Sequence, residues 1–244
     1  MHILYAAALA SIYPYLNRAR QRNVLQAWSS TLLAILNVRL LVNGAPPQRT
    51  DSGHLLVANH VSWLDILAIN AASPVRFVAK SEVSAWPLFG WLVRRSGALF
   101  IRRGLRRDTL RITQAIEHLL RDGDHIALFP QGTSTDASQP VHFHSSTLQG
   151  AIDAQAAVRP LAISYHDDVG HPMPQVAFIG EMTFLQSLWA VLRLRQVHAH
   201  VRYLPLLDCN TLTRREVAVL AQDCVNATLM GRYGQDRAQH SLAP

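Results

Sequence analysis

The chain has 244 residues, of which 49% are hydrophobic and 16% are charged, and its formal net charge is +7. Many apolar residues and little charge exclude an intrinsically disordered protein, and the length supports one large domain with at most a small appendage. Two cysteines exclude a disulfide-rich scaffold, and no apolar run reaches the roughly 20 residues of a clean transmembrane helix. The basic charge favours an anionic partner: nucleic acid, anionic lipid or an acidic carrier protein.

The first 42 residues contain arginines but no acidic residue. The arginines follow the apolar run 1–16 instead of preceding it, which disfavours a cleaved signal peptide. In the uncharged stretch 24–38, apolar residues at helical spacing predict an amphipathic helix with arginines at both ends that could meet lipid headgroups. A helix packed on its own domain fits the same pattern equally well. We expect a helical membrane-association segment at 1–42, a domain at 43–230 and a loose polar tail at 231–244.

From residue 54, short apolar runs alternate with amphipathic stretches. The runs predict strands at 54–58, 75–79, 98–101, 125–129, 160–164, 175–179 and 197–203. The amphipathic stretches predict helices at 63–71, 109–121, 146–156, 184–193 and 214–230. This alternation predicts an α/β fold, a central mixed sheet flanked by helices. Pro160 interrupts its strand and predicts a sheet edge.

The first motif that could carry chemistry is Asn59-His60-Val61-Ser62-Trp63-Leu64-Asp65, between a predicted strand and a predicted helix. His60 and Asp65 can meet only if His60 lies in the loop and Asp65 reaches back from the first helical turn. Asp65 would then accept the Nδ1 proton of His60 and leave Nε2 as a base, as in a catalytic triad without its nucleophile. The plainer alternative is a helix cap, with Ser62 at the N-cap and Asp65 three residues later.

Two further motifs follow predicted strands. Gly97-Ala98-Leu99-Phe100-Ile101 runs into Arg102 and Arg103, and arginine can grip phosphate or carboxylate with two hydrogen bonds. Phe129-Pro130-Gln131-Gly132-Thr133 leads into a tight turn whose backbone N–H groups could hold an anion. Each has an ordinary alternative, a solvated basic surface for the first and a plain turn for the second.

Together with the strand containing Val158-Arg159-Pro160, and in this order, these motifs resemble the glycerolipid acyltransferase family. Its best known members are the 1-acyl-sn-glycerol-3-phosphate acyltransferases. The family pattern is N-H-x4-D, then G-x-x-F-I-x-R, then F-P-E-G-T-R, then an apolar strand with proline. The resemblance covers roughly residues 25 to 205.

The third motif departs from the family pattern at two positions. Gln131 replaces the family glutamate, which keeps an acceptor oxygen but loses the charge, and Ser134 replaces the family arginine. The run from Gly132 to Asp136 looks like the lyso-ornithine lipid acyltransferase branch, whose acceptor carries no headgroup phosphate. Loss of the glutamate also leaves open a non-catalytic relative that only binds membranes.

The resemblance implies transfer of a fatty acyl group from acyl-carrier protein or acyl-coenzyme A to the hydroxyl of a lysophospholipid such as 1-acyl-sn-glycerol-3-phosphate. His60 would be the general base and Asp65 its orienting carboxylate, and no serine or cysteine nucleophile is needed. Arg103, with Arg102 as a helper, would hold the anionic headgroup. Gln131, Gly132 and Thr133 would shape the acceptor site.

The same resemblance implies a peripheral or monotopic protein at the cytoplasmic face of the bacterial inner membrane, with membrane lipids as partners. No cofactor and no metal are expected beyond the acyl donor as co-substrate. A nucleic-acid partner is disfavoured because no recognised motif accompanies the charge. A metal site at His142 and His144, or at His198 and His200, lacks an obvious third ligand.

Overall fold

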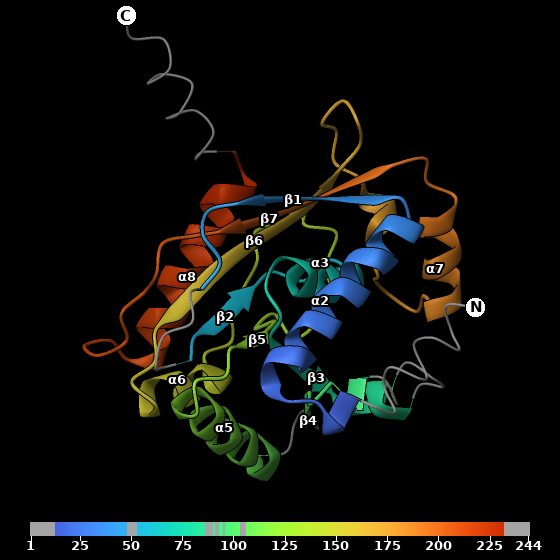
Figure 1. The fold of residues 1–244 in the computed structure, drawn as a ribbon. Helices are drawn as coiled ribbons and strands as arrows, with labels where there is room; N and C mark the ends of the chain where they lie inside the picture. Colours follow the sequence, from blue (N-terminus) through green and yellow to red (C-terminus); the bar gives the residue numbers. More distant parts are fainter. Residues whose placement is uncertain are drawn as a thin grey trace, which may run out of the picture.

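In a computed structural model of the chain, the structure describes residues 13–47, 53–85, 90, 93–94, 96–102 and 106–231 (Figure 1). Three parts of the sequence prediction lie outside these residues: residues 1–12 of the expected membrane segment, Arg103, and the tail beyond Gly231.

A seven-stranded mixed sheet forms the centre of the described fold, in the order β1-β7-β6-β2-β5-β3-β4. Neighbouring strands are parallel except β6 and β7, which are antiparallel. The strands are β1 Val38–Asn43, β2 Leu55–Ala58, β3 Arg76–Lys80, β4 Leu99–Ile101, β5 Ile126–Leu128, β6 Val158–His166 and β7 Val197–Tyr203.

Helices cover both faces of the sheet (Figure 1). The α-helices are α2 Arg18–Ile35, α3 Leu64–Ala72, α5 Arg106–Arg121, α6 Gln149–Asp153, α7 Phe184–Leu192 and α8 Arg214–Leu229. Short 3-10 turns are η1 Tyr13–Tyr15, η2 Ser81–Ala85, η3 Ser146–Leu148 and η4 Pro174–Val176.

Successive side chains along a strand point to opposite faces of the sheet, so the sheet has two hydrophobic cores, one on each face. On β2, Leu56 points into the core with α2, α3 and α7, and Leu55 points into the core with α5, α6 and α8. Both residues are fully buried, as befits a strand near the middle of a parallel sheet. The layers are therefore helix, sheet and helix, and the predicted α/β class with a central mixed sheet is confirmed.

Most predicted elements are found within one to three residues, and the strand expected at 197–203 has those bounds as β7. Two predictions are wrong. Residues 175–179 form no strand, because Pro174 begins the 3-10 turn η4. The helix expected at 146–156 is split into η3 and the short α6, which ends at Asp153.

The expected helical segment at 1–42 also needs correction. The helix α2 ends at Ile35, and Asn37 with φ of 56° turns the chain into β1. Since β1 pairs with β7 along its whole length, a boundary after residue 42 falls inside a strand of the sheet. The helix packs on the domain: Leu33 is buried with α3 residues, and Gln26 donates to the carbonyl of Ala71 at 3.0 Å.

Pro160 lies inside the sheet, not at its edge as predicted, because β6 runs between β2 and β7. Its carbonyl accepts from the N–H of Leu204, and pairing with the next chain resumes between Val158 and Leu207. Because proline has no N–H, the reciprocal hydrogen bond to the carbonyl of Leu204 is missing, and this carbonyl accepts instead from Nη1 of Arg159 at 2.9 Å.

None of the helices in the described part of the chain is long and apolar enough to cross a membrane.

Candidate functional site

His60 and Asp65 meet at the carboxyl end of β2. His60 lies in the loop after the strand, and Asp65 is in the first turn of α3, where it reaches back to that loop. The distance from His60 Nδ1 to Asp65 Oδ2 is 2.7 Å, the contact that the sequence predicted. Because a carboxylate only accepts hydrogen bonds, Nδ1 carries the proton and Nε2 is the basic nitrogen.

The carboxylate of Asp65 is fully buried and fully hydrogen-bonded. Oδ2 also accepts from the backbone N–H groups of Val61 at 2.7 Å and Ser62 at 3.0 Å, and Oδ1 accepts from the hydroxyl of Tyr165 at 2.6 Å. Four donors therefore hold one carboxylate, and its position at the start of α3 also suits a negative charge. The orienting group cannot turn away from His60 without breaking several bonds.

The predicted capping box is only half formed. The side chain of Asp65 accepts from the N–H of Ser62, but α3 begins at Leu64, and the Ser62 hydroxyl has no hydrogen-bond partner among the described residues. The cap and the histidine partner are thus the same carboxylate, as the sequence allowed.

Tyr165 is a site residue that sequence analysis missed. It lies on β6, 100 residues from Asp65, and its side chain is buried in the core beside α3. Burial, with the charge of Asp65 and the hydrogen bond to it, raises the pKa of Tyr165 well above its usual value. The hydroxyl therefore stays protonated and acts as the hydrogen-bond donor to Asp65. No local sequence signal connects two residues so far apart.

His60 is held from several sides. Its backbone N–H donates to Oε1 of Gln131 at 2.6 Å, and its backbone carbonyl accepts from the N–H of Thr135 at 2.9 Å. The imidazole stacks on Phe129, with ring centroids 4.0 Å apart and an angle of 11° between the planes. The side chain remains 22% exposed. The ring is thus fixed in orientation but still accessible.

The turn after β5 supplies these contacts, at the same edge of the sheet as His60, because β2 and β5 run parallel. Gly132 has φ of 80°, a left-handed conformation that glycine adopts without strain, and Thr133 is exposed. The side-chain oxygen of Gln131 accepts from the backbone N–H of His60, and its side-chain nitrogen lies 3.4 Å from Oγ1 of Thr135. The residue that replaces the family glutamate therefore holds the loop that carries His60.

The motif's asparagine has an equally specific structural task. Asn59 is buried, and its side-chain amide donates to the carbonyl of Ile163 at 2.8 Å while its oxygen accepts from the Ile163 N–H at 2.7 Å. This paired contact ties the chain before His60 to β6, the strand that carries Tyr165.

Arg102 follows β4, three strands from β2, so the sheet spacing puts it about 14 Å from His60. It is exposed and forms an ion pair with Asp108, 2.7 Å from Nε to Oδ2. Ser134, at the position of the family arginine, donates to the carbonyl of Phe178. The described residues of the third motif thus offer no cation beside His60.

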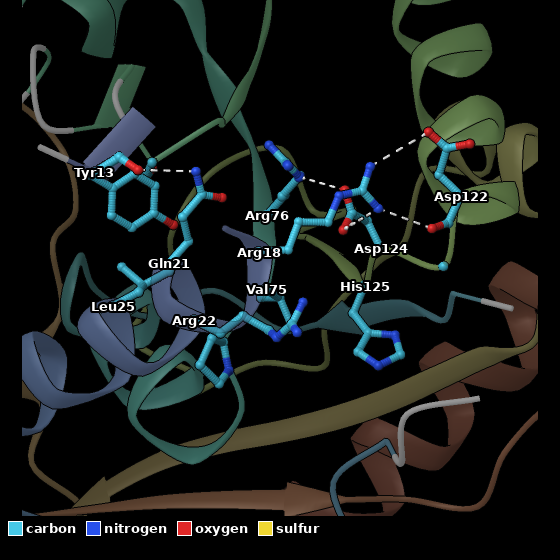
Figure 2. A pocket seen from close by; sticks show the side chains of 13 residues that line it. Tyr13, Arg18, Gln21, Arg22, Leu25, Val75, Arg76, Asp122, Asp124 and His125 are labelled. Carbon is cyan, nitrogen blue, oxygen red and sulfur yellow. Dashed lines mark hydrogen bonds and ion pairs between the residues drawn. The ribbon is translucent and has the colours of Figure 1, made fainter. Parts of the chain in front are cut away.

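A separate cavity of about 320 Å³ lies at the opposite edge of the sheet, where β3 and β5 begin (Figure 2). Asp124 accepts from Arg76 at 2.9 Å and lies 3.5 Å from Arg18, which also approaches Asp122. These ion pairs fasten the start of α2 to the body of the domain.

Among the described residues, no three histidine, cysteine or acidic side chains converge as a metal site. The rings of His142 and His144 pack edge to face. His198 pairs with Asp168 at 2.9 Å, and His200 packs against His166.

Comparison with known proteins identifies the family of the chain. A family model described as Acyltransferase matches residues 39–164. A lyso-ornithine lipid O-acyltransferase of Pseudomonas aeruginosa is 39% identical over 204 residues, 84% of this chain and 77% of the relative. A 1-acyl-sn-glycerol-3-phosphate acyltransferase of Neisseria gonorrhoeae is 34% identical over 193 residues, 78% of this chain and 74% of the relative.

The fold is similar to the crystal structure of the 1-acyl-sn-glycerophosphate acyltransferase PlsC from Thermotoga maritima. The TM-score is 0.67 at 18% identity, and the match covers 95% of both chains. The family model spans more than half of the chain, and close relatives cover most of it. The chain therefore belongs to the acyltransferase family.

Proposed function

We propose that this enzyme moves a fatty acyl group from an acyl thioester to the free hydroxyl of a lysolipid. The observation that carries the proposal is the contact between His60 and the fully held carboxylate of Asp65. Nε2 would take the proton of the hydroxyl as its oxygen attacks the thioester carbonyl. Collapse of the tetrahedral intermediate breaks the carbon–sulfur bond, and the proton passes from Nε2 to the leaving thiolate.

Asp65 stays ionised throughout and stabilises the imidazolium that forms between the two proton transfers. The lysolipid supplies the attacking oxygen, so the reaction needs no nucleophile from the protein. The intact His60–Asp65 pair argues against the non-catalytic relative, since a protein that only binds membranes does not need an oriented base.

For the acceptor, we favour lyso-ornithine lipid, with 1-acyl-sn-glycerol-3-phosphate as the second candidate. Ser134 is uncharged, and its hydroxyl donates to the carbonyl of Phe178. This position therefore offers no cation to a headgroup phosphate. A relative named for lyso-ornithine lipid is 39% identical, and one named for 1-acyl-sn-glycerol-3-phosphate is 34% identical. Arg103 stays the predicted headgroup ligand for the phosphate-bearing acceptor, and Thr133 and Gly132 the predicted walls of the acceptor site.

For the acyl donor, acyl-carrier protein and acyl-coenzyme A are both anionic. The exposed Arg107 and Arg111 lie beside Arg102 around a hollow at the start of α5. Charge complementarity supports this surface as the donor's approach, at the edge of the sheet where His60 lies. Lysolipid acceptors are membrane components, which supports a peripheral or monotopic location at the cytoplasmic face of the inner membrane.

The test is an acyl-transfer assay in detergent micelles with each acceptor, and with acyl-carrier protein and coenzyme A thioesters in parallel. We expect ester formation on lyso-ornithine lipid and its loss in His60→Ala. Transfer to 1-acyl-sn-glycerol-3-phosphate alone would reverse the order of the acceptors. No transfer with either acceptor or donor, by protein that is folded, would contradict the proposal.

A further inference from the structure

The surface of α7 is apolar although it faces away from the core. Three large side chains on this helix are exposed, Leu185 at 73%, Trp189 at 58% and Leu192 at 47%. Their spacing of four and then three residues places them on one stripe. The opposite side of the helix carries Ser187 and Val191, which are buried. Thus α7 has an apolar face on each side, one inside the domain and one outside.

Positive charge adjoins this stripe. Arg193 and Arg195 follow the helix, both are exposed, and neither has a carboxylate partner among the described residues. The guanidinium of Arg193 lies 5.1 Å from the ring of Trp189. Residues 182–201 contain no acidic side chain. An apolar stripe with tryptophan and neighbouring arginines has the chemistry of a helix that lies in the headgroup region of an anionic bilayer.

The buried side of α7 is anchored next to the catalytic loop. Nε1 of Trp63 donates to Oγ of Ser187 at 3.0 Å, and the ring of Trp63 packs edge to face on Phe184. Just before the helix, the N–H of Phe178 donates to the carbonyl of Val61, the residue after His60. A bilayer in contact with the outer face of α7 would therefore be separated from the loop that carries His60 by this helix alone.

From this placement we infer that the outer face of α7, Leu185, Trp189 and Leu192 with Arg193 and Arg195, docks the enzyme on an anionic bilayer. The inference rests on the proposed function in one respect, that the acceptor is a membrane lipid. It differs from the sequence expectation, which gave this role to residues 1–42. The described part of that segment, α2, turns Leu33 inward and exposes the small or polar residues Asn23, Ala27 and Ser30, with Ile35 at its end as the one large apolar side chain exposed on this helix.

Vesicle flotation tests the inference directly. The full chain is mixed with vesicles of phosphatidylglycerol and phosphatidylethanolamine, and with vesicles of phosphatidylcholine alone. We expect the combined variant Leu185→Gln, Trp189→Gln and Leu192→Gln to bind the anionic vesicles at least tenfold more weakly than wild type. Replacing Arg193 and Arg195 by alanine should weaken binding by about fivefold for each arginine, on anionic vesicles only.

The matched control is Val219→Gln with Leu220→Gln on α8, on the other face of the sheet, where these side chains are 53% and 41% exposed. This control should bind vesicles as wild type does, and circular dichroism should show equal folding of all variants. Unchanged vesicle binding by the α7 variant would overturn the inference. So would sedimentation in the absence of lipid that showed a wild-type dimer and a monomeric α7 variant, because a second copy would then cover this face.

The result is independent of the proposed chemistry. Flotation needs no turnover, and acyl transfer by the wild type is measured separately in micelles. Vesicle binding without any acyl transfer would count against the proposed function alone, and acyl transfer with no effect of the α7 substitutions on binding would count against the docking surface alone.

Discussion

The hydroxyl of Tyr165 donates to Oδ1 of Asp65 at 2.6 Å, across a separation of 100 residues, while Oδ2 of the same carboxylate holds His60. One buried carboxylate thus connects the strand β6 to the imidazole of His60. From this relationship we predict that Tyr165 is a positioning residue, which acts on the imidazole through Asp65.

Replacing Tyr165 by phenylalanine should lower kcat about tenfold, roughly 1.4 kcal/mol, because one hydrogen bond to the charged carboxylate is lost. With one donor fewer, the carboxylate should hold the imidazolium more strongly, so the acidic limb of the rate–pH profile should move to higher pH. Steady-state kinetics across pH measures both effects.

The control is Tyr203→Phe on the neighbouring strand β7, where the buried hydroxyl has no hydrogen-bond partner among the described residues. Its rate–pH profile should match that of wild type. A Tyr165→Phe enzyme that is less stable but has an unshifted profile would show that the residue serves folding only.

Asp65→Asn should lower kcat by about 10³- to 10⁴-fold, because a neutral amide does not stabilise the imidazolium as a negatively charged carboxylate does. Stopped or continuous acyl-transfer assays with saturating donor measure this loss. A fall of less than tenfold in a folded variant would rule out the orienting role of the carboxylate.

We predict that Gln131 supports turnover through its side-chain oxygen, which accepts a hydrogen bond, and that its side-chain NH2 group is not required. Gln131→Ala removes the partner of the His60 N–H and should lower kcat about tenfold. Gln131→Glu keeps an acceptor oxygen at this position and restores the family residue, so its kcat should stay within about threefold of wild type. Equal kcat values for alanine and glutamine at this position would contradict the support role seen in the structure.

Because of the histidines on β6 and β7, we predict that the free energy of unfolding depends on pH. Partial burial, with the nearby positive groups His166 and Arg202, lowers the pKa of His200 to about 4, below its value in the unfolded chain. Between about pH 4 and 6.5 the unfolded chain therefore binds more protons, so the free energy of unfolding should fall as the pH falls through this window. Because the ring is partly solvated, the loss should be about 1 kcal/mol.

Denaturant titrations at several pH values test this directly. His200→Gln should flatten the slope of stability against pH between 4 and 6.5, while His142→Gln, at an exposed position ahead of η3, should leave it unchanged. A slope in the His200 variant as steep as in wild type would assign the acid sensitivity to other groups.

Local patterns were sufficient for most of the fold and for the centre of the site. Apolar runs and helix signals predicted six of the seven strands, and the strand–loop–helix context brought His60 and Asp65 together. The missed strand β1 follows α2 directly, and its apolar residues continue the helical spacing. The turn that separates them depends on Asn37 in a left-handed conformation, which asparagine tolerates better than most residues.

The other misses come from tertiary contacts. Pro160 looked like an edge residue because the side chain that replaces its missing N–H, Arg159 on the carbonyl of Leu204, cannot be inferred from sequence. Residues 175–179 form a short apolar run typical of a strand, but their chain makes a single backbone contact with the loop that carries His60, from Phe178 to Val61. Tyr165 was missed for the same reason, since its role depends only on which strand lies beside β2.

The most direct test of the account is acyl transfer by His60→Ala, measured against wild type with both acceptors and a saturating thioester donor, on protein whose folding is checked by circular dichroism. The account predicts a fall in kcat of at least about 10³-fold, because the hydroxyl loses the only base that Asp65 orients. Turnover close to that of wild type by the folded variant would contradict it.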